Sequence, residues 1–424
     1  MRFPTLAPMT SVFRNGRLRD GRSVDVPVDV VVDVVVDGGT IVEVLPHDPS
    51  TPVDGPGTAV DLDGWLLLPP MAEPHAHLDK ALTSESVPNP TGDLPGAIDA
   101  WIAADERGQF TYDDMVERVD QALRKLVLNG VTAVRSHVNA GGGAGTWHLD
   151  ATRAAAARWA GRIDVELVGL VHTPIVGPGS DDNGAALRAC AATGTLIGGC
   201  PHLEPDGDAA IDLALALAAE YAVAVDLHTD ETLDPSMLTL PRLARRVIAT
   251  GVGRNVTASH CVSLGMQTPE TQAEVAALVA EAGIGVVTLP QTNLFLQGRG
   301  RPTATPRGLT AIAALRDAGV VVAAGGDNVQ DPFNLVGRSD PLETAALLVM
   351  AAHILPDDAY EMVSNDARTV MGLPPVRFEV GDPADFVAID APSVRGAIAD
   401  APADRVVVKC GEVVARTSTT RTIC

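Results

Sequence analysis

Histidine is the residue type whose distribution in this chain points most directly to chemistry. Asp327 and Asn328 end one apolar run of strand length, and most of the ten histidines also end or follow such runs. One histidine in such a place is usually a structural residue. Seven of them indicate a functional site, because an ordinary loop layer is more readily filled by solvated carboxylates. These seven histidines are His75, His77, His137, His172, His202, His228 and His260.

Four of these positions form a plausible metal site. His75 and His77 are separated by one residue, so on an extended segment their side chains share one face and can reach a single ion. His228 and Asp327, which follow later apolar runs, would complete a set of three nitrogens and one oxygen. Neutral imidazoles with one carboxylate suit Zn(II) or Fe(II) with an open position for water. We therefore expect one divalent ion per chain.

The elements that must position these residues alternate along the middle of the chain. Eight apolar runs of strand length, beginning with 65–70 and ending with 320–327, are separated by stretches with helical periodicity. Gly130, Gly194, Gly283 and Gly319 stand where a helix would end before the next strand. Eight such units predict a (β/α)8 TIM barrel, in which polar residues at the carboxyl ends of the strands meet at one rim.

Both ends of the chain have a different pattern. Residues 28–46 alternate valine with aspartate and turn at Gly38-Gly39, which is typical of a hairpin with one wet face. The segment from 376 to 417 has the same character. We therefore predict an α/β chain with three parts: residues 1–68 and 376–424 form a small β-sandwich domain from both termini, and residues 69–375 form the barrel that carries the metal site.

The motifs that carry these residues resemble the amidohydrolase superfamily, and within it the bacterial cytosine deaminase branch. The resemblance covers nearly the whole length and is most specific in six segments: EPHAHLDK, GGCPHLEP, VDLHTDE, VTASH, NLFLQGR and GGDNVQDPF. It implies that His75, His77, His228 and Asp327 are the metal ligands. The expected enzyme is therefore a hydrolase that acts on non-peptide C–N bonds.

The same resemblance implies roles for further residues. Glu231 matches the glutamate that acts as acid and base, and His260 matches the histidine that, with Asp327, orients the attacking hydroxide. His202 lies in a segment that lines the substrate pocket. Lys80, in the first loop, is either a pocket residue or a structural one.

The scarcity of lysine favours one metal ion over two. Binuclear members of the superfamily often bridge two metals with a carbamylated lysine from the fourth strand. The only lysines here are Lys80, Lys125 and Lys409, and none can occupy that position. Glu204 is the remaining alternative as a bridging residue.

The expected reaction is hydrolytic deamination of an amino-substituted N-heterocycle of the pyrimidine, pterin, triazine or creatinine-like kind, with release of ammonia. The alternative is cleavage of a cyclic amide or of a bond to a substituted amine, as in N-alkyl triazines. Cytosine itself is expected to be a poor substrate. His172 stands near the place of a pyrimidine-binding glutamine, and Asn328 replaces a second carboxylate and would offer the ring a donor instead of an acceptor.

Composition excludes several other classes. The formal net charge of −23 argues against a nucleic-acid or anionic membrane surface. The five cysteines show no C-x-x-C spacing, and no apolar run is long enough to span a membrane. We therefore expect a cytoplasmic enzyme with a small heterocyclic substrate and free thiols, and a homo-oligomer is compatible with the sequence. A scaffold without activity is disfavoured because all four ligands and Glu231 are retained.

Overall fold

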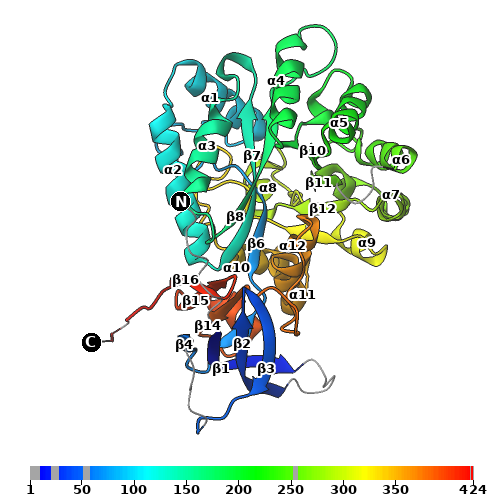
Figure 1. Ribbon diagram of the computed structural model, residues 1–424. Helices are drawn as coiled ribbons and strands as arrows, with labels where there is room; N and C mark the ends of the chain where they lie inside the picture. Colours follow the sequence, from blue (N-terminus) through cyan, green and yellow to red (C-terminus); the bar gives the residue numbers. More distant parts are fainter. Residues whose placement is uncertain (1–9, 21–27, 51–57, 252–255, 421, 424) are drawn as a thin grey trace.

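Two sheets organise the chain in the computed structural model, which describes residues 10–20, 28–50, 58–251, 256–420 and 422–423. One is a barrel surrounded by helices, and the other is built from both ends of the chain and lies beneath the barrel (Figure 1). The first nine residues of the predicted N-terminal part lie outside the described residues.

The barrel consists of eight consecutive parallel strands, which confirms the predicted fold class. A parallel bridge between Ala76 and Asp327 joins the first strand to the segment after the last one. Backbone groups at the rim formed by the carboxyl ends of the strands therefore close the barrel. The strands are β6 (Met71–Ala76), β7 (Val131–Ala140), β8 (Asp164–Val171), β9 (Leu196–Ile197), β10 (Val225–Thr229), β11 (Val256–His260), β12 (Gly285–Thr288) and β13 (Val322–Ala324).

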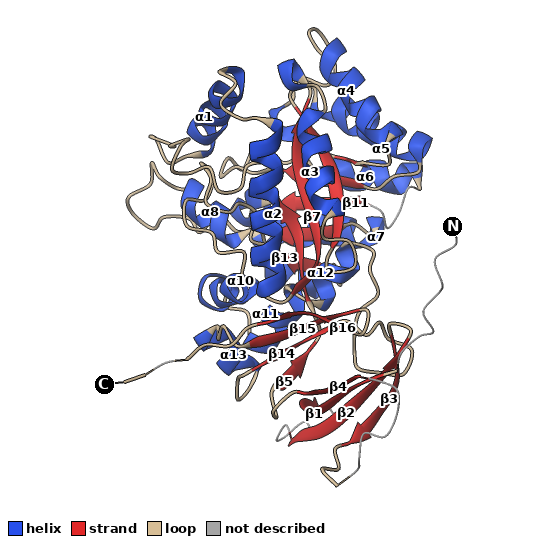
Figure 2. Cartoon of the chain, turned by 60° about the vertical axis from the view of Figure 1, so that its left-hand side comes forward, coloured by secondary structure: helices blue, strands red, loops and turns tan. Residues whose placement is uncertain are grey.

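Helices follow the barrel strands and cover the outside of the barrel (Figure 2). The four glycines predicted at helix ends all have positive φ, and Gly283 is itself a left-handed helix cap. The helices are α1 (Leu94–Glu106), α2 (Tyr112–Leu128), α3 (Trp147–Ala157), α4 (Asp181–Ala192), α5 (Gly207–Tyr221), α6 (Leu240–Thr250), α7 (Pro269–Ala282), α8 (Pro290–Leu296), α9 (Ile312–Asp317), α10 (Pro341–Leu347), α11 (Pro356–Met362), α12 (Asn365–Val370) and α13 (Val394–Asp400). None of the helices in the described residues is long and apolar enough to cross a membrane.

The terminal strands join in one hydrogen-bonded sheet with its own apolar core. Phe13 from the N-terminal part and Phe386 from the C-terminal part meet edge to face, with ring centroids 5.0 Å apart. The two ends of the chain therefore form one unit, as the alternating patterns predicted. Its strands are β1 (Ser11–Asp20), β2 (Val28–Asp37), β3 (Thr40–Pro46), β4 (Thr58–Asp61), β5 (Leu66–Leu68), β14 (Phe386–Ile389), β15 (Arg405–Lys409) and β16 (Glu412–Arg416).

The prediction that the run 65–70 is the first barrel strand is wrong. Leu66–Leu68 pairs with β14 and β1 in the terminal sheet, and the first barrel strand begins at Met71. The run is apolar on both faces because the terminal core and the barrel core both contact it: Leu67 belongs to the first, Leu66 and Leu68 to the second.

A buried arginine fastens the terminal sheet to the barrel. Arg405, 1% exposed, donates to both carboxylate oxygens of Asp340 at 3.0 and 2.7 Å and to the backbone oxygen of Asn129 at 2.7 Å. Bidentate pairing of this kind fixes orientation as well as adding energy.

Candidate active site

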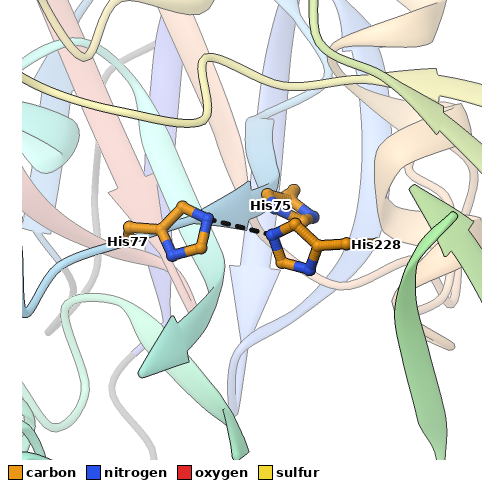
Figure 3. Close-up of side chains that lie close together, drawn as sticks. All are labelled: His75, His77 and His228. Carbon is orange, nitrogen blue, oxygen red and sulfur yellow. Dashed lines mark hydrogen bonds between the residues drawn. The ribbon is translucent and has the colours of Figure 1, made fainter. Parts of the chain in front are cut away.

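The four predicted metal ligands converge at the rim where the barrel closes. One ring nitrogen from each of His75, His77 and His228 lies within 4.8 Å of the other two. Figure 3 shows the three imidazoles close together, with Nε2 of His77 3.2 Å from Nε2 of His228. Asp327 Oδ1 lies 3.3 Å from His77 Nε2 and 3.7 Å from His75 Nε2. The structure therefore brings together His75 and Asp327, which are 252 positions apart in the sequence.

A hydrogen bond at Nδ1 fixes the tautomer of His75. The hydroxyl of Ser259 donates to Asp226 at 2.8 Å, so its oxygen can only accept from His75 Nδ1, which lies 2.9 Å away. Nε2 of His75 then carries the lone pair. Such outer partners orient ligating histidines and raise their basicity.

His77 is fixed in the same sense by a backbone group. Its Nδ1 lies 3.1 Å from the carbonyl oxygen of His137 and must donate to it, which leaves the lone pair on Nε2. The ammonium of Lys80 also lies 3.3 Å from this Nδ1, but its short hydrogen bond of 2.7 Å goes to Asn139. We assign the proton to His77 Nδ1 because a carbonyl oxygen can only accept.

These assignments show that the cluster fits a cation. The lone pairs of His75 and His77 face a carboxylate oxygen, and His75 Nε2 and both oxygens of Asp327 are buried without a hydrogen-bond partner in the described residues. Burial and the neighbouring histidines lower the pKa of His75 and His228 well below its usual value, so both rings are neutral. Lone pairs aimed at an anion repel it, whereas a divalent ion among them would satisfy all of these groups.

The backbone around Asp327 is held by the seam of the barrel. Its N–H donates to the carbonyl of His75 at 3.1 Å, and its carbonyl accepts from the N–H of His77 at 3.3 Å. The carboxylate of Glu73 accepts from the N–H groups of Gly326 at 2.9 Å and His75 at 3.3 Å. Burial raises the pKa of Glu73 to about 8. Asp327 has φ +64°, a conformation that costs energy in a non-glycine residue and is common at functional sites.

Glu231 and His260 lie beside the ligand cluster, where the sequence predicted acid–base residues. His260 Nδ1 is 3.4 Å from Glu231 Oε1, and its Nε2 is 4.0 Å from Asp327 Oδ2. Burial, with the charge of Asp327, raises the pKa of Glu231 well above its usual value, and burial lowers the pKa of His260 to about 4. A protonated carboxyl and a neutral imidazole side by side can exchange a proton with a bound molecule.

A cavity opens onto these residues, and its lining is partly polar and partly apolar. It holds about 890 Å³ of empty space, part of it open to solvent. The polar part of the lining includes His77, Lys80, Asn139, His228, Glu231, His260, Thr292, Asp327 and Asn328. The apolar part, called the apolar wall below, is mainly Leu94, Ile98, Trp101, Ile102, Leu170, Val171, Leu203 and Phe333. A cavity of this composition suits a flat heterocycle with a few polar edges.

The remaining predicted substrate residues differ in their placement. Lys80 and His172 line the cavity, and burial lowers the pKa of His172. Lys80 also pairs with Asp79 at 3.3 Å, so it is both a pocket residue and a structural one. His202 is not among the lining residues: its Nδ1 lies 3.2 Å from the carbonyl oxygen of His228. This geometry supports a role for His202 in positioning a ligand strand.

The hydrogen bonds of Asn328 bear on the expectation that it offers the substrate a donor. Its Nδ2 donates to Asp331 Oδ2 at 2.8 Å, while its Oδ1 accepts from the hydroxyl of Thr292 at 3.3 Å. One of the two N–H groups of the amide is therefore used within the protein. Residue type alone does not say which end of an amide faces the ligand.

The alternative of Glu204 as a bridging ligand finds no support in the geometry. Both of its carboxylate oxygens lie 3.1 Å from the backbone nitrogen of Ile175. Within the described part of the chain it belongs to none of the clusters that could hold an ion. The expectation of one ion per chain is thus kept as a proposal.

Asp226 and Ser259 escaped the sequence argument, which named His137 among the seven histidines but gave it no role. His137 stacks on His75 with ring centroids 4.0 Å apart, and Asp226 and Ser259 support His75. Burial alone would raise the pKa of Asp226, but His137, Arg135 and Ser259 together lower it. A usable signal existed for Asp226: it stands two residues before His228 on the same strand, and so on the same face.

The hydrogen bond between His75 and Ser259 leads to a first prediction. Ser259→Ala removes the acceptor that fixes the tautomer of His75, so we expect metal affinity to fall by about 10–100-fold with little change in thermal stability. Competition with a chelator measures the affinity. Ser263→Ala is the control, because it removes a buried hydroxyl that bonds to the Met237 carbonyl at 2.7 Å, outside the metal cluster. Equal affinities in the two variants would contradict the role of Ser259.

Comparison with known proteins agrees with this geometry. A family model described as the amidohydrolase family matches residues 100–416. A pterin deaminase from Rhizobium rhizogenes is 33% identical over 363 residues, which cover 84% of this chain and 82% of the relative.

Solved structures give the same picture over nearly the whole chain. The 5-methylcytosine deaminase from Klebsiella pneumoniae liganded with 5-fluorocytosine has a TM-score of 0.84 at 26% identity, covering 97% of this chain and 99% of that one. N-isopropylammelide isopropylaminohydrolase from Burkholderia multivorans has a TM-score of 0.80 at 27% identity, covering 96% and 98%.

The fold and the family match together define the class: the chain belongs to the amidohydrolase family. The predicted resemblance and the predicted enzyme class, a hydrolase of non-peptide C–N bonds, are confirmed.

Proposed function

We propose that this chain hydrolyses the exocyclic amino group of a fused bicyclic aminoheterocycle of the pterin class, with release of ammonia. The observation that carries the proposal is the lining of the cavity, which combines the polar groups of the site with eight apolar side chains around about 890 Å³ of empty space. A fused bicyclic ring would cover more of this apolar lining than a single six-membered ring. The relative named pterin deaminase supports the same class of substrate.

The metal site would supply the nucleophile. A divalent ion held by His75, His77, His228 and Asp327 would, when bound, lower the pKa of a water molecule toward about 7. The choice between Zn(II) and Fe(II) is left to elemental analysis, since three nitrogens and one oxygen suit both.

The protein groups then move the protons. Glu231 protonates a ring nitrogen, which makes the adjacent carbon electrophilic, and His260 with Asp327 orients the water that adds to it. The C–N bond breaks, and the amino nitrogen leaves as ammonia while the carbon keeps the oxygen as a carbonyl. One water is consumed for each ammonia released, and each positioned proton-transfer group contributes about 10²–10⁴-fold.

Ammonia release from a panel of heterocycles tests the proposal. Pterin is expected to be turned over with formation of lumazine, its 2,4-dioxo product. An N-alkylamino triazine in the same panel tests the second candidate, a hydrolase that expels a larger amine, which the isopropylaminohydrolase relative favours. No turnover of pterin together with release of alkylamine would replace the proposal with that candidate.

Cytosine is expected to be a poor substrate in this panel. The missing second ring leaves the apolar wall in contact with water, and each missing methylene-sized group in such a pocket costs about 10–200-fold in kcat/KM. We expect cytosine to fall at least about 100-fold below pterin. A kcat/KM for cytosine above about 10⁴ M⁻¹s⁻¹, in the ordinary range for a native substrate, would contradict the expectation.

A further inference from the structure

A buried carboxylate outside the metal cluster binds a side chain that lines the cavity. Asp331 is fully buried and lies in the loop after β13. Its Oδ1 accepts from the backbone nitrogens of Phe333 at 2.8 Å and Asn334 at 3.1 Å. Its Oδ2 is left for one partner, the Nδ2 of Asn328 at 2.8 Å.

These bonds decide which end of the Asn328 amide faces Asp331. Burial raises the pKa of Asp331 to about 7, so above that pH its carboxylate is ionised and has no proton to give. It then binds the amino end of the amide and turns the carbonyl end away. That carbonyl end lies on the side of Thr292, and both residues line the catalytic cavity. An amide oxygen has two lone pairs, and the hydroxyl of Thr292 uses one of them.

The backbone of Asn328 is held as well. Its carbonyl accepts from Nδ2 of Asn334 at 3.0 Å, and the side chain is 2% exposed. The backbone of Asn328 is thus fixed by Asn334 and its amide is held by Asp331 and Thr292, so a flip of the amide is the change that would alter what it offers.

We infer that Asp331 is a positioning residue that makes Asn328 a hydrogen-bond acceptor, so that the enzyme selects heterocycles with an N–H at this wall. The inference rests on the proposed function for its choice of substrate. Pterin meets the requirement, because its pyrimidine ring carries an amide N–H beside the amino-bearing carbon. A heterocycle with only ring nitrogen lone pairs on that edge would be rejected.

A cycle of isosteric variants tests the inference. Asp331→Asn keeps an oxygen for the two backbone N–H groups and turns an amino group toward Asn328. The amide of Asn328 must then flip and present its own amino group to the substrate. Because a donor would face a donor, we expect kcat/KM for pterin to fall by at least about 100-fold, within the range known for sites left with unpaired polar groups.

The double variant, Asp331→Asn with Asn328→Asp, restores an acceptor on the cavity side. Its new carboxylate accepts from the introduced amide with one oxygen and from the substrate with the other. We expect kcat/KM to return to within about tenfold of wild type. Metal content and thermal stability should be unchanged in Asp331→Asn. A loss of activity in this variant would then come from the reversed hydrogen bond and not from loss of structure.

Two results would overturn the inference: Asp331→Asn within about fivefold of wild type, or a double variant no better than Asp331→Asn. Turnover of pterin by the wild type judges the proposed function separately. If another heterocycle with a ring N–H is turned over instead, the same cycle is measured on that compound. A neutron structure of the wild-type protein provides a readout without substrate: an Asn328 amide whose oxygen, and not its ND₂ group, faces Asp331 would also overturn the inference.

Discussion

Glu231→Gln is expected to reduce turnover by about 10²–10⁴-fold, the usual contribution of a positioned acid–base group, while the metal content stays unchanged. The side chain is buried and lies 3.4 Å from His260, and burial raises its pKa well above the usual value. The amide has the same shape but cannot carry a proton between water and a ring nitrogen. Steady-state ammonia release and elemental analysis of the same preparation measure both effects.

The control for this variant is Glu204→Gln, which makes the same chemical change in a carboxyl that bonds to the Ile175 backbone. It is expected to retain activity within a few-fold of wild type. Activity of Glu231→Gln within about tenfold of wild type would contradict the assigned role.

Purified wild-type protein is expected to contain one divalent ion per chain, and His228→Ala is expected to lose it. His228 supplies a buried neutral nitrogen within the cluster of His75 and His77. Removal of a ligand itself should weaken binding by more than the roughly 10–100-fold that follows loss of an outer partner such as Ser259. Elemental analysis after dialysis measures the content, and turnover should disappear with the ion.

His148→Ala is the matched control, since His148 is equally buried but pairs with Asp105 at 3.3 Å outside the cluster. It should keep its ion. Two ions per wild-type chain, or none after expression in metal-rich medium, would contradict the site.

The fold could be predicted because the pattern that indicates it, an apolar run followed by a helical stretch, is repeated along the chain. Eight such units are compatible with few folds. The wrong assignment of Leu66–Leu68 to the barrel arose because this strand is apolar on both faces. Periodicity reports burial, and it does not say which of two sheets a fully buried strand joins.

The convergence of the four proposed ligands could be predicted because these residues combine an unusual type with a fixed place at strand ends. The residues that orient them could not. Ser259 and Asp331 act through the direction of one hydrogen bond each, at 2.9 Å to His75 and 2.8 Å to Asn328. A serine or an aspartate in a loop has no distinctive pattern, and the direction of a hydrogen bond depends on atoms brought from elsewhere in the chain.

The bridge that closes the barrel has a consequence for how the protein is made. Ala76 pairs with Asp327, and the first and last strands meet only when the chain has reached its eighth unit. Three of the proposed ligands are already synthesised by residue 228, but the fourth arrives with the segment that closes the barrel. During synthesis the unfinished chain thus holds an incomplete set of proposed ligands and an open seam. The proposed site is completed in the same step that closes the barrel, before strands β14, β15 and β16 complete the terminal sheet.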